Sequence, residues 1–183
     1  MTKTLLVLRH AKSDRGDKAA RDHDRPLASR GEADAPRMGT TLAALDAIPD
    51  CILTSTAVRA RETTRLVAAA MGYDGEIVEE ADIYAASVDM LLDVLRDCDE
   101  ETTVLLVGHN PGLEELICLL TGGVGAEPIV RLPTAGLACL ALDIEYWSQL
   151  VPESGLLQWF LTPRIVYPLL HVSRDLDHAT ETD

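Results

Sequence analysis

The chain has 183 residues, of which 47% are hydrophobic, and this is enough for one domain with a sizeable core. Its 16 basic and 30 acidic side chains give a formal net charge of −14, which argues against duplex nucleic acid or an anionic membrane as the main partner. A phosphorylated substrate is compatible with this charge, because a local group of arginines can outweigh a distant negative field. We expect one domain over residues 1–170 and a polar tail over 171–183.

Short apolar runs rich in β-forming residues alternate along the chain with longer amphipathic patterns. Continuous hydrophobicity over 5–8 and 104–107 predicts central strands buried on both faces. The last two strands have no helix between them, which predicts an antiparallel pair at one edge. The alternation as a whole predicts an α/β sheet covered by helices on both faces. The predicted strands are 4–9, 51–54, 76–79, 103–108, 136–144 and 156–162, and the predicted helices are about 31–46, 56–71, 87–98 and 112–121.

The cysteines and the N-terminus bear on the compartment. Four cysteines, at positions 51, 98, 118 and 139, form no C-x-x-C pair and match no zinc spacing. Each lies in or beside an apolar run, which predicts buried thiols and is compatible with a reducing cytoplasm. The N-terminus is typical of a strand rather than of a signal peptide, and no apolar run approaches the roughly 18 residues of a membrane span. We therefore expect a cytoplasmic protein.

Two histidines stand where predicted strands end. Arg9 and His10 close the first strand, in the run LLVLRHAKSD, and His109 follows the strand TVLLVG. In open α/β sheets, ligands bind beyond the carboxyl ends of the strands. A lone histidine there is more often a satisfied or solvated residue. Two histidines at equivalent strand ends, one of them preceded by an arginine, favour a shared site if the two strands are neighbours.

Two predicted helices begin at the same edge of the sheet. Asn110 is a good N-cap, and the free N–H groups and dipole of the helix that follows favour an anion. Ser55 or Thr56 is expected to cap the helix after the second strand, which places Arg59 in the first turn of that helix. Glu62, three residues on, is placed to hold Arg59.

Two arginines and two histidines around a helix N-terminus predict a pocket for a tetrahedral dianion, because the planar guanidinium fork matches phosphate oxygens. No recognisable metal-ligand motif accompanies the histidines. The sequence also lacks a G-x-S-x-G nucleophile elbow, a P-loop and a G-x-G-x-x-G fingerprint. We expect neither a metal nor a cofactor.

The segment 11–30 is long, charged and irregular, which predicts a functional loop or a lid. Lys12 and Ser13 directly follow His10 and are candidates for substrate contact. Arg25 could rim the pocket or serve only the local turn. His23, within an acidic run, is expected to be solvated.

Four segments together resemble the histidine phosphatase superfamily, also called phosphoglycerate mutase-like: LRHAKSD, DRPLASRGEADAPRMG, TSTAVRARETT and VGHNPG. The similarity is greatest to the SixA-type phosphohistidine phosphatase branch and runs in order from residue 4 to about 165, although RHA replaces the commoner RHG. The resemblance implies a three-layer α/β/α sandwich with a mostly parallel sheet and no cofactor.

The resemblance also implies roles for the four site residues. His10 would be the nucleophile that becomes phosphorylated. Arg9 and Arg59 would bind the phosphoryl oxygens, and His109 would donate to them. The two neighbouring arginines disfavour the imidazolium form and so help to keep His10 neutral.

One departure from the family pattern concerns the proton donor. Many members carry a glutamate general acid three residues before an aromatic, but here the stretch is EEADIYAAS and Ala81 stands three residues before Tyr84. Glu80 and Asp82 have the wrong offset, and Asp82 is kept as a candidate donor through a loop shift. The imidazole of phosphohistidine can be protonated before it leaves and needs a general acid less than an alkoxide does. The gap favours a phosphoramidate substrate.

The leading hypothesis is a metal-independent phosphatase that works through phospho-His10, with a phosphohistidine-containing protein as its partner. The alternatives among enzymes are a broad-specificity small-molecule phosphomonoesterase and a phosphoglycerate-type mutase. A non-catalytic module for phosphorylated ligands is disfavoured, because binding alone needs no nucleophile. The sequence decides neither the oligomeric state nor the roles of segments 11–30 and 145–160.

Overall fold

The computed structural model describes residues 2–14, 16, 21–98, 100–122 and 130–168, so the predicted tail lies outside the described residues. A six-stranded sheet has the order β3-β2-β4-β1-β5-β6. Every predicted strand is present, and no end differs from its predicted position by more than two residues. The strands are β1 (Lys3–Arg9), β2 (Cys51–Ser55), β3 (Glu76–Glu80), β4 (Thr103–Gly108), β5 (Leu137–Leu142) and β6 (Gly155–Leu161).

The sheet is mostly parallel. β1 pairs in parallel with β4, β4 with β2, and β2 with β3. β5 runs antiparallel to both β1 and β6, so the predicted antiparallel pair at one edge is confirmed. Because β1 and β4 lie at the centre, both of their faces must be covered by helices.

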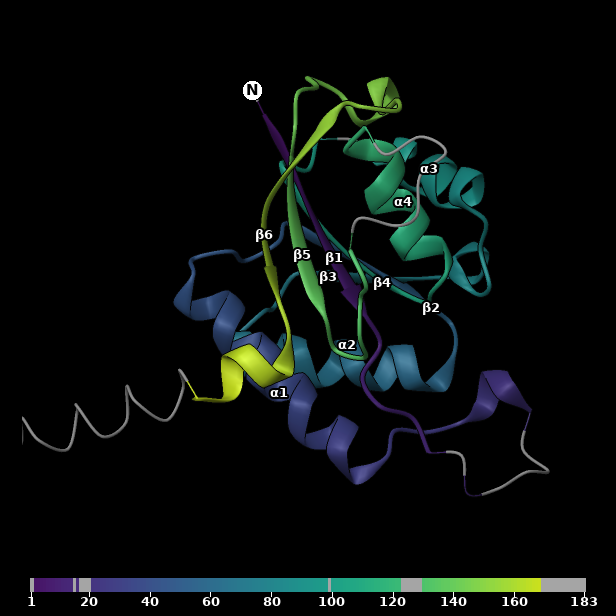
Figure 1. Cartoon of the computed structure of the whole chain (residues 1–183), viewed down its shortest axis with the longest axis vertical. Helices are drawn as coiled ribbons and strands as arrows, with labels where there is room; N and C mark the ends of the chain where they lie inside the picture. The colour runs from purple at the N-terminus through teal and green to yellow at the C-terminus, as the bar shows by residue number, and fades with distance from the viewer. Residues whose placement is uncertain (1, 15, 17–20, 99, 123–129, 169–183) are drawn as a thin grey trace, which may run out of the picture.

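Four helices form the two outer layers (Figure 1). On one face of the sheet, Leu6 and Leu8 of β1 pack with the cores of α1 and α2. On the other face, Leu5 and Val7 pack with α3 and α4, and all four leucine and valine side chains are fully buried. The predicted three-layer α/β/α sandwich is therefore confirmed. The helices are α1 (Ser29–Ala44), α2 (Val58–Met71), α3 (Val88–Arg96) and α4 (Gly112–Leu120).

Two predicted caps are wrong. The N-cap of α2 is Ala57, because Ser55 is still the last residue of β2. The N-cap of α4 is Pro111 rather than Asn110, whose side chain instead donates from Nδ2 to the carbonyl of Leu132 at 3.0 Å. Both side chains have long-range partners, and the Ser55 hydroxyl, which also accepts from Ala57 N at 3.3 Å, lies 2.8 Å from Nε2 of His109.

A helical segment over 163–168 and three short 3₁₀ turns complete the described fold; the turns are η1 (Asp22–Asp24), η2 (Ala81–Ile83) and η3 (Trp147–Gln149). Trp147 is fully buried and donates from Nε1 to the carbonyl of Glu101 at 2.7 Å, so this part of segment 145–160 serves internal packing. Three of the four cysteines are buried and Cys98 is half-buried. No helix within the described ranges is long and apolar enough to cross a membrane.

Candidate active site

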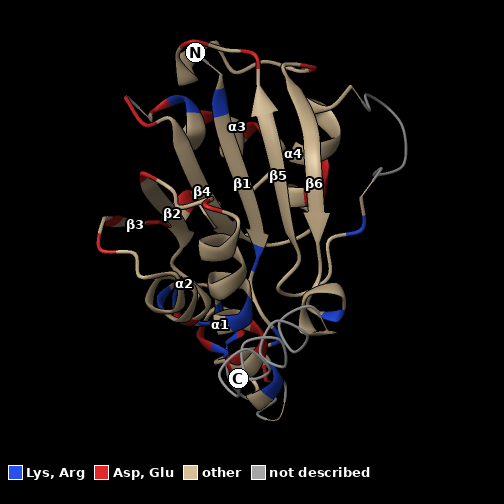
Figure 2. Ribbon diagram, turned by 90° about the vertical axis from the view of Figure 1, so that its left-hand side faces the viewer, with Lys and Arg blue, Asp and Glu red and all other residues tan. Residues whose placement is uncertain are grey.

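The register between β1 and β4 brings the two histidines together. Arg9 pairs with Gly108 across these neighbouring parallel strands, so the residues that follow them, His10 and His109, leave the sheet side by side. Their ring centroids lie 5.0 Å apart, and the residues are only 8% and 9% exposed. Figure 2 shows β1 with a basic residue at each end, and Arg9 marks the end that carries this site.

The hydrogen bonds of His10 define its tautomer. Nδ1 lies 2.7 Å from the carbonyl oxygen of Ala11, which can only accept, so the ring proton is on Nδ1. Nε2 therefore carries the lone pair, and it accepts a hydrogen bond from Nε of Arg59 at 3.2 Å. The backbone after His10 is braced as well, because Ala11 N donates to Oγ1 of Thr63 at 2.9 Å. A neutral imidazole with a fixed lone pair on Nε2 is the form that a nucleophile requires.

Arg59 lies between the two histidines and is only 5% exposed. Its Nη2 donates to Nδ1 of His109 at 3.3 Å and to Oδ2 of Asp22 at 2.9 Å. The predicted partner Glu62 does not hold it, because Glu62 Oε2 accepts from Leu27 N at 2.7 Å. Asp22 takes this place because η1 packs against α2, which the sequence does not reveal.

His109 is held on both ring nitrogens. Nδ1 must accept, because an arginine can only donate, so Nε2 carries the proton and donates to Oγ of Ser55 at 2.8 Å. Tyr84 packs edge-on against the ring at 5.5 Å between centroids. Ser55 ends β2 and Tyr84 directly follows η2, so two strand ends and one 3₁₀ turn converge on this imidazole.

Arg9 and Asn110 meet at a loop that the sequence analysis did not connect with the site. Nη1 of Arg9 donates to the carbonyl of Leu132 at 2.8 Å, and the Asn110 amide donates to the same oxygen. Glu114 of α4 fixes this loop, because its Oε1 accepts from Leu132 N at 2.7 Å. Oδ1 of Asn110 is buried without a hydrogen-bond partner in the part of the chain described.

Burial is the largest influence on both imidazoles. It lowers the pKa of His10 to about 4, against the opposing hydrogen bond to Ala11 and with added lowering from Arg59 and Arg9. Burial also lowers the pKa of His109 to about 3, followed by the effects of His10 and Arg59. The arginines help to keep His10 neutral, as the sequence predicts, but desolvation is the larger cause. Both rings are neutral at pH 7.

The remaining predicted site residues differ in placement. Ser13 is buried and forms an isolated bridge with Leu27, while Lys12 is exposed. Asp82 is exposed in η2 and lines a hollow of about 240 Å³ together with acidic side chains such as Glu80. Neither histidine is among the residues of that hollow.

Sequence reasoning missed three residues at the mouth of the site. Asp22 contacts Arg59, and the hydroxyl of Tyr84 donates to Asp22 Oδ2 at 3.0 Å. His23, predicted to be solvated, hydrogen-bonds through Nε2 to Thr56 at 3.0 Å and packs edge-on against Tyr84 at 4.8 Å. The available signal was the charged run that contains Asp22 and His23, since it lies in the loop that the sequence marks as functional.

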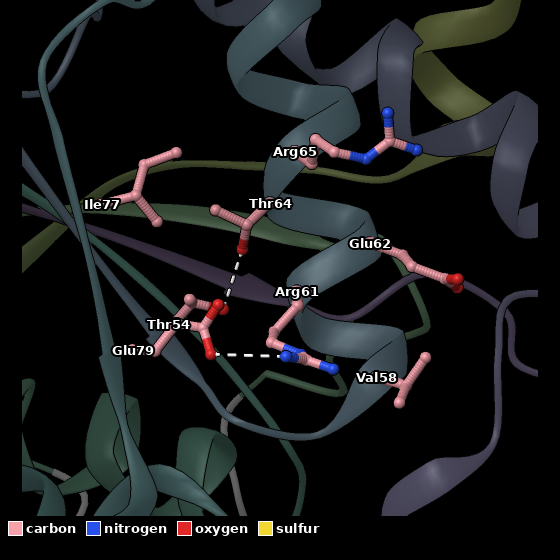
Figure 3. A pocket seen from close by; sticks show the side chains of 8 residues that line it. All are labelled: Thr54, Val58, Arg61, Glu62, Thr64, Arg65, Ile77 and Glu79. Atoms are coloured by element: carbon pink, nitrogen blue, oxygen red, sulfur yellow. Dashed lines mark hydrogen bonds and ion pairs between the residues drawn. The ribbon is translucent and has the colours of Figure 1, made fainter.

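A larger cavity of about 430 Å³ lies between α2 and β3 and is separate from this site (Figure 3). Thr64 donates to Thr54 at 2.8 Å within it. Arg61 forms an ion pair of 3.6 Å with Glu79 of β3. Its lining includes Arg61 and Arg65 but contains neither histidine and neither Arg9 nor Arg59.

Known proteins share this fold. A protein-family model described as histidine phosphatase superfamily (branch 1) matches residues 5–84. The structure of a candidate phosphohistidine phosphatase SixA from Agrobacterium tumefaciens has a TM-score of 0.75 and 32% identity, covering 89% of this chain and 99% of that chain. A second candidate SixA, from Nakamurella multipartitia, has a TM-score of 0.74 and 28% identity, covering 89% and 97% of the two chains. An uncharacterized protein from Mycobacterium tuberculosis is 35% identical over 164 residues, which are 86% of this chain and all of that protein.

The chain belongs to the histidine phosphatase superfamily. Within it, the chain falls in the SixA-like branch, and it is a phosphatase of the hydrolase class. The predicted family, fold and enzyme class are thereby confirmed.

Proposed function

We propose that this protein removes phosphate from phosphohistidine in a protein partner through a covalent intermediate on His10. The observation that carries the proposal is the state of His10: buried, neutral, with its proton held on Nδ1 by Ala11 and its Nε2 lone pair beside Arg59. The candidate SixA phosphatases that the chain resembles carry the same activity in their names.

The reaction runs in two displacements. Nε2 of His10 attacks phosphorus, and the bond between phosphorus and the substrate nitrogen breaks, so the substrate imidazole leaves as a neutral ring if its other nitrogen is already protonated. Water then attacks phospho-His10 and the Nε2–phosphorus bond breaks, releasing inorganic phosphate and a proton. Because Ala11 keeps the Nδ1 proton in place, His10 also leaves as a neutral imidazole. Neither leaving group needs a separate acid.

The positive groups around His10 bind the phosphoryl oxygens in this scheme. Arg9 and Arg59 supply guanidinium donors in a site with little water, where such donors are most effective. His109 accepts from Arg59 in the free enzyme, so its donation to a phosphoryl oxygen requires a proton on Nδ1. A bound dianion favours that protonated form, because an opposite charge raises the pKa of an imidazole. Asn110, the exposed Lys12 and the buried Ser13 complete the proposed set of substrate-binding residues.

The substrate class follows from the missing donor. Ala81 occupies the place of the family's glutamate, and Asp82 lines an acidic hollow that lacks the histidines. An alkyl phosphate would then leave as an unprotonated alkoxide, which is a poor leaving group. Phosphoramidates avoid this difficulty, and we rank them above phosphate esters.

The test measures phosphate release from phosphohistidine and from an alkyl phosphate by wild-type protein and the His10→Ala variant. We expect kcat/KM to be at least about 10²-fold higher for phosphohistidine, the scale of one general acid–base contribution. The His10→Ala variant is expected to release no phosphate, and a rapidly quenched wild-type reaction is expected to show the mass of a phosphoryl group on the His10 peptide.

Other outcomes point to the alternatives. A preference for the alkyl ester at neutral pH would identify a phosphomonoesterase, and transfer to an acceptor without phosphate release would identify a mutase. Binding of phosphate with no adduct and no turnover would leave a binding module. His23→Gln is the matched control, because His23 lies at the mouth without contacting His10 among the described contacts.

A further inference from the structure

The carboxylate of Asp22 lies where an anionic substrate would have to bind. Its Oδ2 accepts from Nη2 of Arg59 at 2.9 Å and from the Tyr84 hydroxyl at 3.0 Å. Its Oδ1 forms an ion pair of 2.7 Å with Nη2 of Arg25. One carboxylate thus joins two guanidinium groups at the mouth of the site, where η1 packs against α2.

All three guanidinium nitrogens of Arg59 already have partners. Nε donates to His10, Nη2 donates to His109 and Asp22, and Nη1 donates to the Asp22 carbonyl. These contacts use four of the five N–H donors of Arg59, so a phosphoryl group that takes two donors, as a bidentate ligand does, must replace at least one of them. The side chain of Asp22 is 57% exposed, whereas His10 and His109 are buried, so Asp22 is the partner that water can take up at least cost.

Arg25 is the second arginine that the Asp22 carboxylate contacts. Its Nε is buried and has no hydrogen-bond partner among residues that the structure describes. Its charge also acts on His10, since Arg25 is one of the groups that lower the pKa of that imidazole. A buried donor without a partner, close to a site for a dianion, is suited to a third phosphoryl contact.

We infer that Asp22 is a resident counter-ion, which occupies Arg25 and Arg59 in the free enzyme and is displaced when a phosphoryl dianion binds to both. This inference rests on the proposed function. A dianion has more charge and more acceptor oxygens than a carboxylate, so it can displace Asp22 where a monoanion competes poorly. After hydrolysis, Asp22 returns to the arginines and helps to expel inorganic phosphate. Asp22 therefore acts as a specificity and release residue through Arg59.

The experiment is calorimetric titration of inorganic phosphate into wild-type protein and three variants. Asp22→Asn is expected to bind phosphate at least about threefold more tightly, the effect of removing a partly exposed ion pair. Arg25→Ala is expected to bind it more weakly than wild type. Asp24→Asn is the matched control, since Asp24 is on the same turn and contacts His23 rather than an arginine, and it should stay within about twofold of wild type.

The sign of the change decides between two roles. If Asp22 only positions Arg59, or if its loss disturbs the fold, Asp22→Asn weakens phosphate binding, and that result overturns the inference, as does unchanged binding. A thermal melt of each variant separates the loss of fold from the loss of affinity. Failure of the proposed function is a distinct result, because it appears as absent phospho-His10 and absent turnover while phosphate still binds.

Discussion

The side chain of His10 owes its state to its surroundings rather than to an acidic partner. The Ala11 carbonyl fixes the proton on Nδ1, and burial lowers the pKa of the ring to about 4. His109 has the same kind of environment, with its proton directed at Ser55 and its pKa lowered to about 3. The site therefore holds two neutral imidazoles, and this lowers the free energy of unfolding when the protein is acidified.

The two lowered pKa values predict how the stability of the protein depends on pH. Both pKa values are lower in the folded protein than the ordinary value of 6.5, so the unfolded chain binds more protons as the pH falls below 6.5. The stability that depends on neutral histidines is complete above pH 6.5 and is lost as the pH falls toward 4. Each histidine is expected to contribute about 1.4 kcal/mol per pH unit in that window.

Urea denaturation of wild type and of the variant His10→Gln/His109→Gln tests this prediction. The free energy of unfolding of wild type should fall more steeply between pH 6.5 and 4.5 than that of the variant, and the two slopes should agree above pH 7. Parallel slopes over the whole range would show that the histidines are not held neutral by the fold.

The helices α1 and α2 meet so closely that one position has no room for a side chain. A Cβ on Gly39 would lie 2.3 Å from the carbonyl oxygen of Val67 and 2.9 Å from Cβ of Ala70. The carbonyl of Val67 is part of the α2 backbone, so it can make room for a Cβ on Gly39 only if one of the two helices moves. The close contact matters for function because α2 carries Arg59 and Thr63 at its other end.

Gly39→Ala is therefore expected to destabilise the protein by about 1–3 kcal/mol, the usual effect of overpacking a core. Helix propensity alone favours the change by about 1 kcal/mol, so the two effects oppose each other and the measured sign reports which is larger. Thr40→Ala, at an exposed position of the same helix, is the control and should stay within about 0.5 kcal/mol of wild type. Urea denaturation measures both variants, and a Gly39→Ala protein that is more stable than wild type by the full gain in helix propensity would contradict the close contact.

The elements were predictable because their signals are local. Periodicity places every strand and helix, and the central position of β1 follows from its unbroken apolar run. The two histidines could be found because strand ends mark the sites of α/β sheets. The partners of Arg59 and Asn110 could not, since Asp22 and Leu132 reach them from loops far along the chain. Sequence spacing suggests Glu62 and a helix cap in their place, and tertiary contacts override both.

At the scale of the whole molecule, the net charge of −14 opposes the compact state through self-repulsion. The carboxylates are spread over the surface, with groups around β3 and along the loops (Figure 2). The arginines at the active site are few by comparison. The charge of the arginines at the active site and the net charge of the molecule thus have opposite signs. Their effects on phosphate binding and on stability can be tested separately.

Salt is expected to raise the melting temperature. The Debye length falls from about 30 Å at 0.01 M to about 10 Å at 0.1 M ionic strength, so most of the long-range repulsion is screened over that range. Sodium chloride and choline chloride should give equal increases, because the effect is nonspecific. Chloride salts are preferred to sulfate, which would bind to the arginines. A melting temperature that falls with either chloride would show that attractive surface ion pairs outweigh the repulsion.

The register of β1 with β4 also has a consequence for how the protein is made. His10 leaves the ribosome early, but its neighbour His109 follows only after α1, β2, α2, β3 and α3 have been synthesised. A nascent chain that ends before Thr103 holds His10 with neither its central neighbouring strand nor the second imidazole. The two imidazoles of the site thus come together only when the middle of the sheet closes, and under the proposed mechanism a growing chain is inactive before it has folded.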